Sequence, residues 1–479
     1  MTPVYATEES LDFALNHIER FGDTDIFPIP FEYSAIRSNW TDFKRYLLTQ
    51  DLDCYSTRPL RRTLSPKHLY GFRIATQLDP IDTIIYTTIA YEIGSQIETA
   101  RVPIAKNVVY SYRFNPDISS GRFYDNNVGY RHFIQQCQSL SKNPDCSYVV
   151  VADIADFFPR IYYHPLENML DTVTNKSDYA RIIKKLLNKW NSSISYGIPV
   201  GQTVSRLLAE IAISDIDQAL LSENINYCRF SDDFRIFCKD ETEAYSCLSF
   251  LANCLFVNHG LTLQQIKTKI LTKNEFREYF LTTEEMQEEK SLSEKFSDML
   301  SEIGITDWYE EIDYDELSEE DQEKIDSLNL IDILNKELAK DNIDYGLMKF
   351  VLGRLTQINN AEAKDVVLSK IEVLYPVFKD VVCYLKGIRK FDTSTKNSIG
   401  KKLLSYLTNS FITHLEYHRS WILSVFTEDT EWDNEKVFCK LYSEMLDVFS
   451  KRELILAMGR ANQYHWFKTQ KQNLGQFDP

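Results

Sequence analysis

The sequence predicts an α+β protein in which a mixed region of strands and helices is followed by a long helical region. Two observations indicate the mixed region: an apolar run that ends in an aspartate, and a β-hairpin whose turn holds two more aspartates. The third observation is a change of pattern beyond residue 326, where apolar residues recur at helical spacing. The 479 residues, 44% of them hydrophobic, suggest two or three domains with packed cores.

The apolar run comes first along the chain and covers residues 148–152, with Asp153 at its C-terminal end. A short continuous apolar run is typical of a strand buried on both faces. A carboxylate at the end of such a strand can project from the sheet. Asp153 is therefore a candidate for chemistry at the sheet edge.

A loop rich in glycine and proline, residues 197–202, leads into a predicted amphipathic helix. Glycine at positions 197 and 201 lets the main chain approach a ligand closely, and a helix N-terminus favours phosphate. Taken alone, the segment also fits an ordinary loop that enters a helix. Four residues define the apolar face of the helix: Val204, Leu207, Leu208 and Ile211.

The hairpin is predicted over residues 226–238, where two β-prone segments flank Ser231, Asp232 and Asp233 with almost no spacer. An Asp-Asp pair in a turn is more often simple turn chemistry. Adjacent carboxylates repel each other, however, unless a cation lies between them. If Asp153 joins the pair, the three form a site for two Mg²⁺ or Mn²⁺ ions roughly 3.5 to 4 Å apart, as used in phosphoryl transfer.

In their order along the chain, these segments resemble motifs A, B and C of reverse transcriptases. Asp153 followed by Asp-Phe-Phe resembles motif A, the Gly-Ile-Pro-Val-Gly loop resembles motif B, and Phe-Ser-Asp-Asp resembles motif C. Residues 259–270, a Gly-Leu-Thr-Leu stretch that leads to Lys267 and Thr268, resemble motif D. The resemblance implies the fingers and palm of a right-hand polymerase, followed by an α-helical C-terminal domain.

The resemblance assigns roles residue by residue. Asp153, Asp232 and Asp233 match the catalytic metal ligands, and Ile154 matches a position that contacts both metal and nucleotide. Phe158 stands five residues after Asp153, where the family has an aromatic steric gate. A ring at this position would clash with a 2′-hydroxyl, so the resemblance implies a preference for deoxynucleotides.

Further nucleotide contacts are implied in the same way. Lys267 matches the motif D lysine, a proton donor or charge neutraliser for departing pyrophosphate. Lys67 and Arg73 fall where the family's fingers place basic residues over the incoming triphosphate, and arginine suits bidentate phosphate contact. Gly201 and Gln202 of the motif B loop complete the implied nucleotide-binding set.

The subfamily is indicated by segments 22–28, 78–82 and 108–114, which resemble bacterial reverse transcriptases of the "unknown group". These include abortive-infection and other defence-associated enzymes. The resemblance implies an RNA-directed DNA polymerase of anti-phage defence, and some relatives make DNA without a supplied template and prime from a protein hydroxyl. Two alternatives stay open: a templated enzyme that copies a partner RNA, as retron and intron enzymes do, and a nonenzymatic scaffold.

The expected partners are deoxynucleotides and RNA or a single-stranded DNA product, while homo-oligomers, a partner protein and a noncoding RNA stay open. Residues 284–326 hold 18 acidic and 3 basic residues, so they carry most of the net charge of −17 and repel nucleic acid. Nine cysteines without a pairing pattern, and no apolar run of transmembrane length, predict a cytoplasmic protein without a membrane partner. The implied parts are an N-terminal extension (1–60), fingers (61–145), palm (146–280), an acidic connector (281–326) and a helical thumb-like C-terminal domain (327–479).

Overall fold

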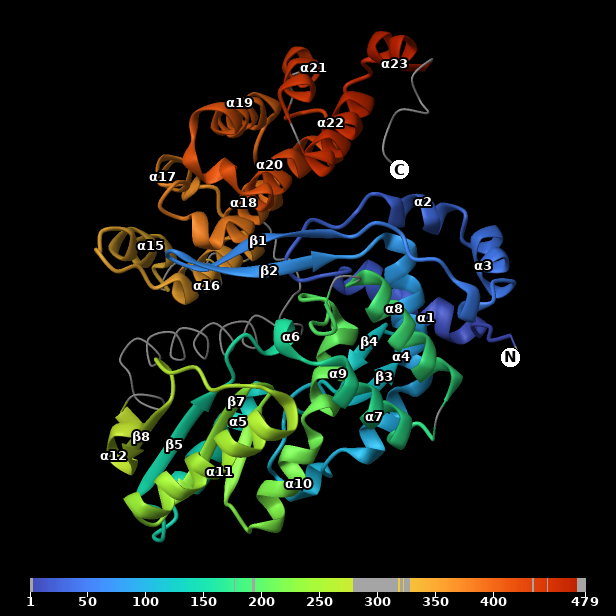
Figure 1. The fold of residues 1–479 in the computed structure, drawn as a ribbon. Coiled ribbons are helices and arrows are strands. Elements are labelled where there is room, and N and C mark those ends of the chain that lie inside the picture. The colour runs from blue at the N-terminus through green and yellow to red at the C-terminus, as the bar shows by residue number, and fades with distance from the viewer. Residues whose placement is uncertain are drawn as a thin grey trace. The chain divides into compact units, whose positions relative to one another are not determined.

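The computed structural model describes residues 3–175, 177–191, 194–278, 318, 322, 328–432, 435–445 and 447–471. The predicted acidic connector therefore lies outside the described residues, except for Ser318 and Gln322. The predicted α+β class is confirmed, with mixed helices and strands first and a helical C-terminal region after them (Figure 1). None of the described helices combines the length and the apolar character needed to cross a membrane.

The chain divides into two compact units, and each is described by itself. The first unit comprises Met1–Asp25, Ile29–Arg62 and Ala75–Thr283, and the second comprises Ile26–Pro28, Thr63–Ile74 and Glu284–Pro479. The strands are β1 (Arg61–His68), β2 (Gly71–Gln77), β3 (Phe114–Asp117), β4 (Arg122–Tyr124), β5 (Tyr148–Asp153), β6 (Tyr227–Phe230), β7 (Asp233–Cys238) and β8 (Lys269–Thr272). The helices of the first unit are α1 (Glu8–Phe21), α2 (Glu32–Ser38), α3 (Trp40–Leu48), α4 (Pro80–Ala100), α5 (Tyr130–Ser141), α6 (Phe157–Arg160), α7 (Tyr163–Val173), α8 (Asp178–Trp190), α9 (Thr203–Ala212), α10 (Ser214–Ser222), α11 (Glu241–His259) and α12 (Lys273–Phe276).

An antiparallel sheet with strand order β6–β7–β5–β8 lies within the first unit. The predicted hairpin is present as β6 and β7, with Ser231 and Asp232 in its turn. β5 pairs with β7 so that Asp153 lies opposite Asp233, and it pairs with β8 so that Val151 lies opposite Lys269. The apolar run and the hairpin are therefore neighbours in one sheet.

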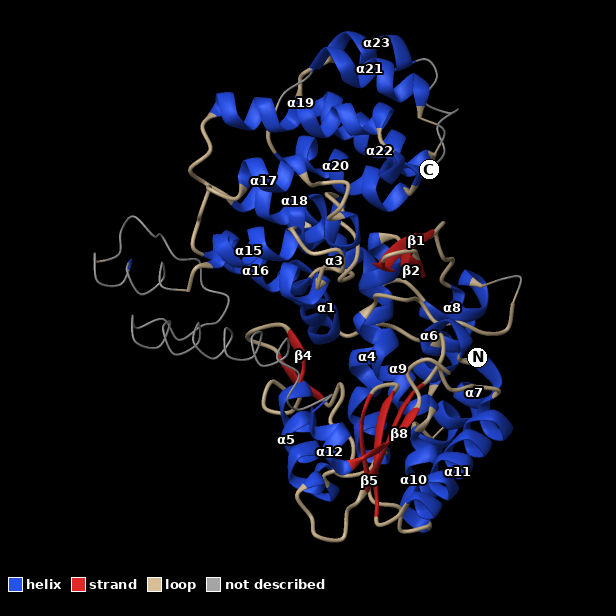
Figure 2. Ribbon diagram, turned by 90° about the vertical axis from the view of Figure 1, so that its left-hand side faces the viewer, coloured by secondary structure: helices blue, strands red, loops and turns tan. Residues whose placement is uncertain are grey.

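Both faces of β5 are covered, as its continuous apolar run predicts. Successive side chains of a strand point to opposite faces. Val150 and Ala152 join the large core of the first unit, whereas Val149 and Val151 join a second cluster that includes Phe133 of α5. Each fully buried side chain of this kind contributes roughly 1.5 to 3 kcal/mol. Figure 2 shows α5 and α12 on one side of the sheet and α10 and α11 on the other.

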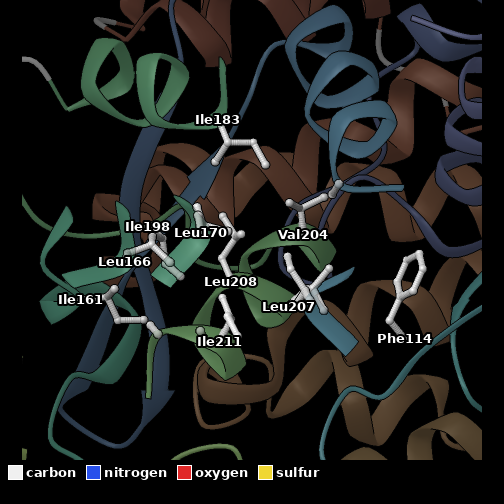
Figure 3. Packing of buried hydrophobic residues seen from close by; sticks show 14 of the residues in the cluster. Phe114, Ile161, Leu166, Leu170, Ile183, Ile198, Val204, Leu207, Leu208 and Ile211 are labelled. Atoms are coloured by element: carbon white, nitrogen blue, oxygen red, sulfur yellow. The ribbon is translucent and has the colours of Figure 1, made fainter. Parts of the chain in front are cut away.

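Helix α9 is packed into the core by the apolar face that the sequence predicts. Figure 3 shows Leu207, Leu208 and Ile211 among core side chains that include Leu166 and Leu170 of α7. All of these side chains are buried. This packing fixes the N-terminal end of α9, and with it the end of the glycine loop that precedes the helix.

The second unit is mainly helical. α16 packs on α18, α18 on α20, and α20 on α22. α20 was not predicted, because its buried residues surround the helix and leave no polar face to give an amphipathic period. The last two helices are separate elements, with a break at Asn462, where φ is 57°. The helices are α15 (Leu330–Leu338), α16 (Tyr345–Gln357), α17 (Lys364–Ser369), α18 (Phe378–Gly387), α19 (Thr393–Asn409), α20 (Glu416–Glu428), α21 (Glu435–Glu444), α22 (Val448–Arg460) and α23 (Tyr464–Gln470).

Two short segments from early in the chain belong to this helical unit. In the tip of the β1–β2 hairpin, the main-chain N–H of Tyr70 donates to the hydroxyl of Tyr375 over 3.0 Å. In Ile26–Pro28, the carbonyl of Ile26 accepts a hydrogen bond from Nε1 of Trp421, also over 3.0 Å. The second unit is therefore built from three separate stretches of the sequence.

Candidate active site

The three candidate aspartates meet at one end of the sheet. Asp153 is the last residue of β5 and lies opposite Asp233, the first residue of β7. Residues that lie directly opposite in an antiparallel pair share one face of the sheet. Asp232 is held beside them because its carbonyl accepts a hydrogen bond from the N–H of Ile154 over 3.1 Å. The main chain alone thus brings the three residues together.

The electrostatics of this cluster are unfavourable for three negative charges. Burial, followed by the charges of Asp153 and Asp233, raises the pKa of Asp232 to about 6. Burial also raises the pKa of Asp233, although Arg235, whose Nη1 lies 3.6 Å from the carboxylate, partly offsets the effect. The carboxylates repel one another in a poorly hydrated place, and a cation would relieve that repulsion.

The donor set fits a divalent cation that prefers oxygen. Within the part of the chain that the structure describes, no three His, Cys, Asp or Glu side chains are already arranged around a metal position. The chemistry of the set nevertheless suits Mg²⁺ or Mn²⁺, because carboxylates are hard ligands and these three are crowded, with Asp153 buried and the other two partly buried. Asp153, Asp232 and Asp233, together with the main chain of Ile154, are the groups that would hold such an ion.

Lys267 lies against the same cluster. Its Nζ atom donates to Oδ2 of Asp153 over 2.7 Å. Burial alone would lower the pKa of Lys267, but the hydrogen bond to Asp153 and the charges of all three aspartates raise it, so the side chain stays protonated. Main-chain hydrogen bonds hold the segment that carries Lys267 at the end of β5. The N–H of Gln264 donates to the carbonyl of Asp153 (2.7 Å), and the N–H of Ala155 donates to the carbonyl of Thr262 (2.8 Å).

The predicted gate residue and the glycine loop are joined to each other. The carbonyl of Phe158 accepts a hydrogen bond from the N–H of Ile198 over 3.1 Å. Gly197 has φ of +89°, and a Cβ atom there would lie 3.1 Å from the carbonyl oxygen of Pro159, so this position requires glycine. The ring of Phe158 is half-buried and packs beside Phe157, with the ring centroids 5.5 Å apart.

Gly201 and Gln202 occupy different environments. Gly201, with φ of 103°, lines a cavity of about 330 Å³ together with Thr203 and Arg206. Gln202 is buried, with 2% of its surface exposed, and its main chain pairs with that of Thr24. Its Nε2 atom has no hydrogen-bond partner among the described residues. The structure thus places the side chain of Gln202 inside the protein rather than on an open surface.

Lys67 and Arg73 lie on β1 and β2, and both are exposed. They belong to the second unit, through the segment Thr63–Ile74, whereas all three aspartates belong to the first. Their assignment to the triphosphate stays a prediction.

Sequence reasoning missed a buried ionic cluster behind the hairpin turn. It includes Ser111, Glu210, Asp217 and Arg229, none of which is more than 2% exposed. A usable signal was present, because Glu210 stands in the apolar run of α9 and Arg229 stands in a predicted strand. Charged residues in such places are buried only when they are paired.

Comparison with known families identifies the part of the chain that carries this site. Residues 104–320 match the family model of reverse transcriptase (RNA-dependent DNA polymerase). The matched stretch includes the three aspartates, Phe158 and Lys267. The chain therefore contains a reverse transcriptase domain. The protein is a nucleotidyltransferase of the RNA-directed DNA polymerase type.

Solved structures that match this chain include telomerases. Apo telomerase from Candida tropicalis is 10% identical, with 82% of this chain and 74% of that chain covered and a TM-score of 0.34. Telomerase from Candida albicans in complex with a fragment of telomeric RNA is 12% identical, with 83% and 71% covered and a TM-score of 0.35. A partial Cas6-RT-Cas1–Cas2 complex is 20% identical over 52% of this chain and 41% of that chain, with a TM-score of 0.27. No curated protein matches the chain.

Proposed function

We propose that the protein joins deoxynucleotides to a hydroxyl primer at the site formed by Asp153, Asp232 and Asp233. The observation that carries this proposal is the meeting of three carboxylates at one end of the sheet, with Asp153 buried and Asp232 and Asp233 partly buried. Divalent ions held by these carboxylates would lower the pKa of the attacking hydroxyl and neutralise the triphosphate.

The reaction is an in-line displacement at phosphorus. The primer oxygen forms a bond to the α-phosphorus, the bond from that phosphorus to the bridging oxygen breaks, and pyrophosphate leaves. The hydroxyl proton passes to solvent. Lys267 lies at the cluster as a protonated ammonium, so it can give a proton to the departing pyrophosphate.

Selection of the sugar is assigned to Phe158. Its main chain is tied to the glycine loop by the hydrogen bond to Ile198, and its ring is half-buried against the core. A ring held in this way would exclude a 2′-hydroxyl by contact. The substrates under this proposal are therefore deoxynucleoside triphosphates.

We further propose that the enzyme acts in defence against phage, and that synthesis starts from a protein hydroxyl without a supplied template. The support is the resemblance of segments 22–28, 78–82 and 108–114 to defence-associated reverse transcriptases. An RNA or a partner protein that triggers the enzyme belongs to the same proposal.

One experiment tests the chemistry and the mode of synthesis together. The purified protein is incubated with Mg²⁺ and each labelled deoxynucleotide after nuclease treatment, with Asp232→Ala as the control and with a primed RNA template in a parallel arm. Label that remains on the denatured protein and is lost in the variant supports protein-primed synthesis. Incorporation that needs the added RNA, or that is lost on RNase treatment, would show that the enzyme copies an RNA instead of starting from a protein hydroxyl. No incorporation in any arm contradicts the proposed activity.

The defence role needs a separate test in cells. Bacteria that express the wild-type protein or Asp232→Ala are challenged with a panel of phages, and plaques are counted. Protection that depends on Asp232 supports the proposal. Equal plaque counts with both proteins across the panel contradict it.

A further inference from the structure

The turn that carries Asp232 has a demanding main-chain conformation. Ser231 has φ of 55°, in the left-handed region. For a residue other than glycine this conformation is strained. The turn therefore persists only where surrounding contacts hold it.

Two side chains hold the main chain of Ser231 from opposite ends. Its N–H donates to Oγ of Ser111 over 2.8 Å. Its carbonyl accepts a hydrogen bond from Nη1 of Arg229 over 3.1 Å. Ser231, Ser111 and Arg229 are all buried, so water does not compete for these contacts.

One carboxylate orients both of these side chains. Glu210 accepts a hydrogen bond from Oγ of Ser111 at Oε1 (2.5 Å) and another from Nη1 of Arg229 at Oε2 (2.9 Å). Arg101 donates to the same Oε2 atom over 2.7 Å. Glu210 is fully buried, and the guanidinium groups of Arg101 and Arg229 balance its charge.

The guanidinium of Arg229 is also anchored from behind. Asp217 accepts hydrogen bonds from Nε (2.7 Å) and Nη2 (2.6 Å) in a bidentate pair. Burial alone would lower the pKa of Arg229, but Asp217 and Glu210 raise it, so the group stays charged. A planar pair of this kind fixes the direction of Nη1 toward the turn.

We propose that Ser111 and Glu210 are positioning residues for Asp232, which they influence through the main chain of Ser231. The inference rests on the proposed function, because it gives Asp232 the role of a metal ligand. Glu210 stands near the C-terminal end of α9, the helix that follows the glycine loop, while Asp232 stands in the hairpin turn. The cluster therefore couples the helix that follows the loop to the metal-binding turn.

The test compares two buried serines that each lose one hydroxyl. Ser111→Ala removes the acceptor for the Ser231 N–H, whereas Ser141→Ala removes a hydroxyl that donates to the carbonyl of Gln138 on α5, away from the turn. The half-saturating Mn²⁺ concentration is measured by electron paramagnetic resonance on the full chain, and in parallel by deoxynucleotide incorporation. Melting temperatures report how far each variant is destabilised.

We expect Ser111→Ala to raise the half-saturating Mn²⁺ concentration about tenfold, because the hydrogen bond that holds the N–H of Ser231 is lost together with the one to Glu210. Ser141→Ala should leave that concentration unchanged at a similar melting temperature. A lower melting temperature for Ser111→Ala with unchanged Mn²⁺ binding would overturn the inference. If Ser111→Ala does not fold, Ser111→Cys keeps the volume with a weaker hydrogen bond and decides the question in the same way.

The same experiment separates this inference from the proposed function. If the wild-type protein binds Mn²⁺ but incorporates no nucleotide, the proposed activity fails, and the resonance titration still decides the positioning role. If Mn²⁺ does not bind, or binds equally well to wild type and Asp232→Ala, Asp232 is not a ligand and the positioning role is overturned.

Discussion

Nζ of Lys267 donates a hydrogen bond to Oδ2 of Asp153 over 2.7 Å, so the candidate proton donor contacts a candidate metal ligand directly. The lysine is half-exposed, with 51% of its side-chain surface accessible, and can therefore turn toward a bound triphosphate without unfolding its segment.

The first prediction concerns this lysine. Lys267→Met should lower the rate of incorporation about a hundredfold, because a positioned general acid typically contributes that much. Single-turnover incorporation measures the chemical step. Lys269→Met, two residues further on and also exposed, is the matched control and should retain the wild-type rate. Equal rates for the two variants would remove Lys267 from the reaction.

The second prediction concerns sugar selection. Phe158→Ala should raise the use of ribonucleotides relative to deoxynucleotides about tenfold, because the ring that excludes the 2′-hydroxyl is gone. Competition between labelled ATP and dATP measures the ratio. Phe157→Leu, in the fully packed neighbouring position, should change stability and leave the ratio unaltered. An unaltered ratio in Phe158→Ala assigns sugar selection to another residue.

The third prediction separates activity from stability in the acidic cluster. Asp232→Asn should abolish incorporation without lowering the melting temperature, because it removes one of three mutually repelling carboxylates. The variant Asp240→Ala should instead lower the melting temperature and leave incorporation unchanged. Asp240 caps α11 by accepting a hydrogen bond from the N–H of Glu243 over 2.8 Å, so its loss should cost about 1 kcal/mol while activity persists. Retained activity in Asp232→Asn contradicts the site.

The fourth prediction is a pH dependence of stability from His17. Its Nδ1–H donates to the carbonyl of Gly121 (2.9 Å), and its Nε2 faces Oγ1 of Thr203 at 3.1 Å. Burial, opposed by the hydrogen bond to Gly121 and assisted by the charge of Arg206, lowers the pKa of His17 from 6.5 to about 4. The unfolded chain therefore binds the proton first as the pH falls, so stability is full above pH 6.5 and is lost toward pH 4.

The loss attributable to His17 should reach roughly 3 kcal/mol. Urea unfolding midpoints at several pH values measure the slope for the wild type and for His17→Gln, which does not titrate. The slope between pH 4 and 6.5 should be smaller for the variant. Identical slopes would show that His17 is not held neutral in the folded protein.

The fifth prediction concerns the glycine loop. Gly197→Ala should lower stability by roughly 1 to 3 kcal/mol and reduce incorporation, because φ is +89° and the added Cβ meets the carbonyl of Pro159. At Gly353 in α16, an added Cβ would meet no described atom within 4 Å outside its own helix backbone and its chain neighbours, so Gly353→Ala should raise stability by about 0.5 to 1 kcal/mol. Thermal unfolding of both variants makes the comparison.

The elements that the sequence predicts well are those with a local signal. The apolar run of β5, the hairpin around Ser231 and the amphipathic face of α9 each follow from residues within a few positions of one another. The pairing of Asp153 with Asp233 follows in turn from the burial of β5 between neighbouring strands. For these elements the prediction agrees with the structure, because the local sequence pattern and the burial of the residues favour the same arrangement.

The features that the sequence did not predict depend on distant contacts. Gln202 is buried, and its main chain pairs with that of Thr24, which lies near the N-terminal end of the first unit. The contact between Ser111 and Glu210 joins two residues 99 positions apart. No local pattern reports such pairs, and α20 lacked a signal because burial on every side erases the amphipathic period.

The chain passes between its two units after residues 25, 28, 62, 74 and 283. A single cut before residue 284 would therefore not release two finished domains. It would separate Tyr70 from Tyr375 and Ile26 from Trp421, so the N-terminal fragment would keep two segments of the helical unit and the C-terminal fragment would lack them. Transfer of residues 1–283 to another protein would therefore carry these two segments without the helices of their own unit.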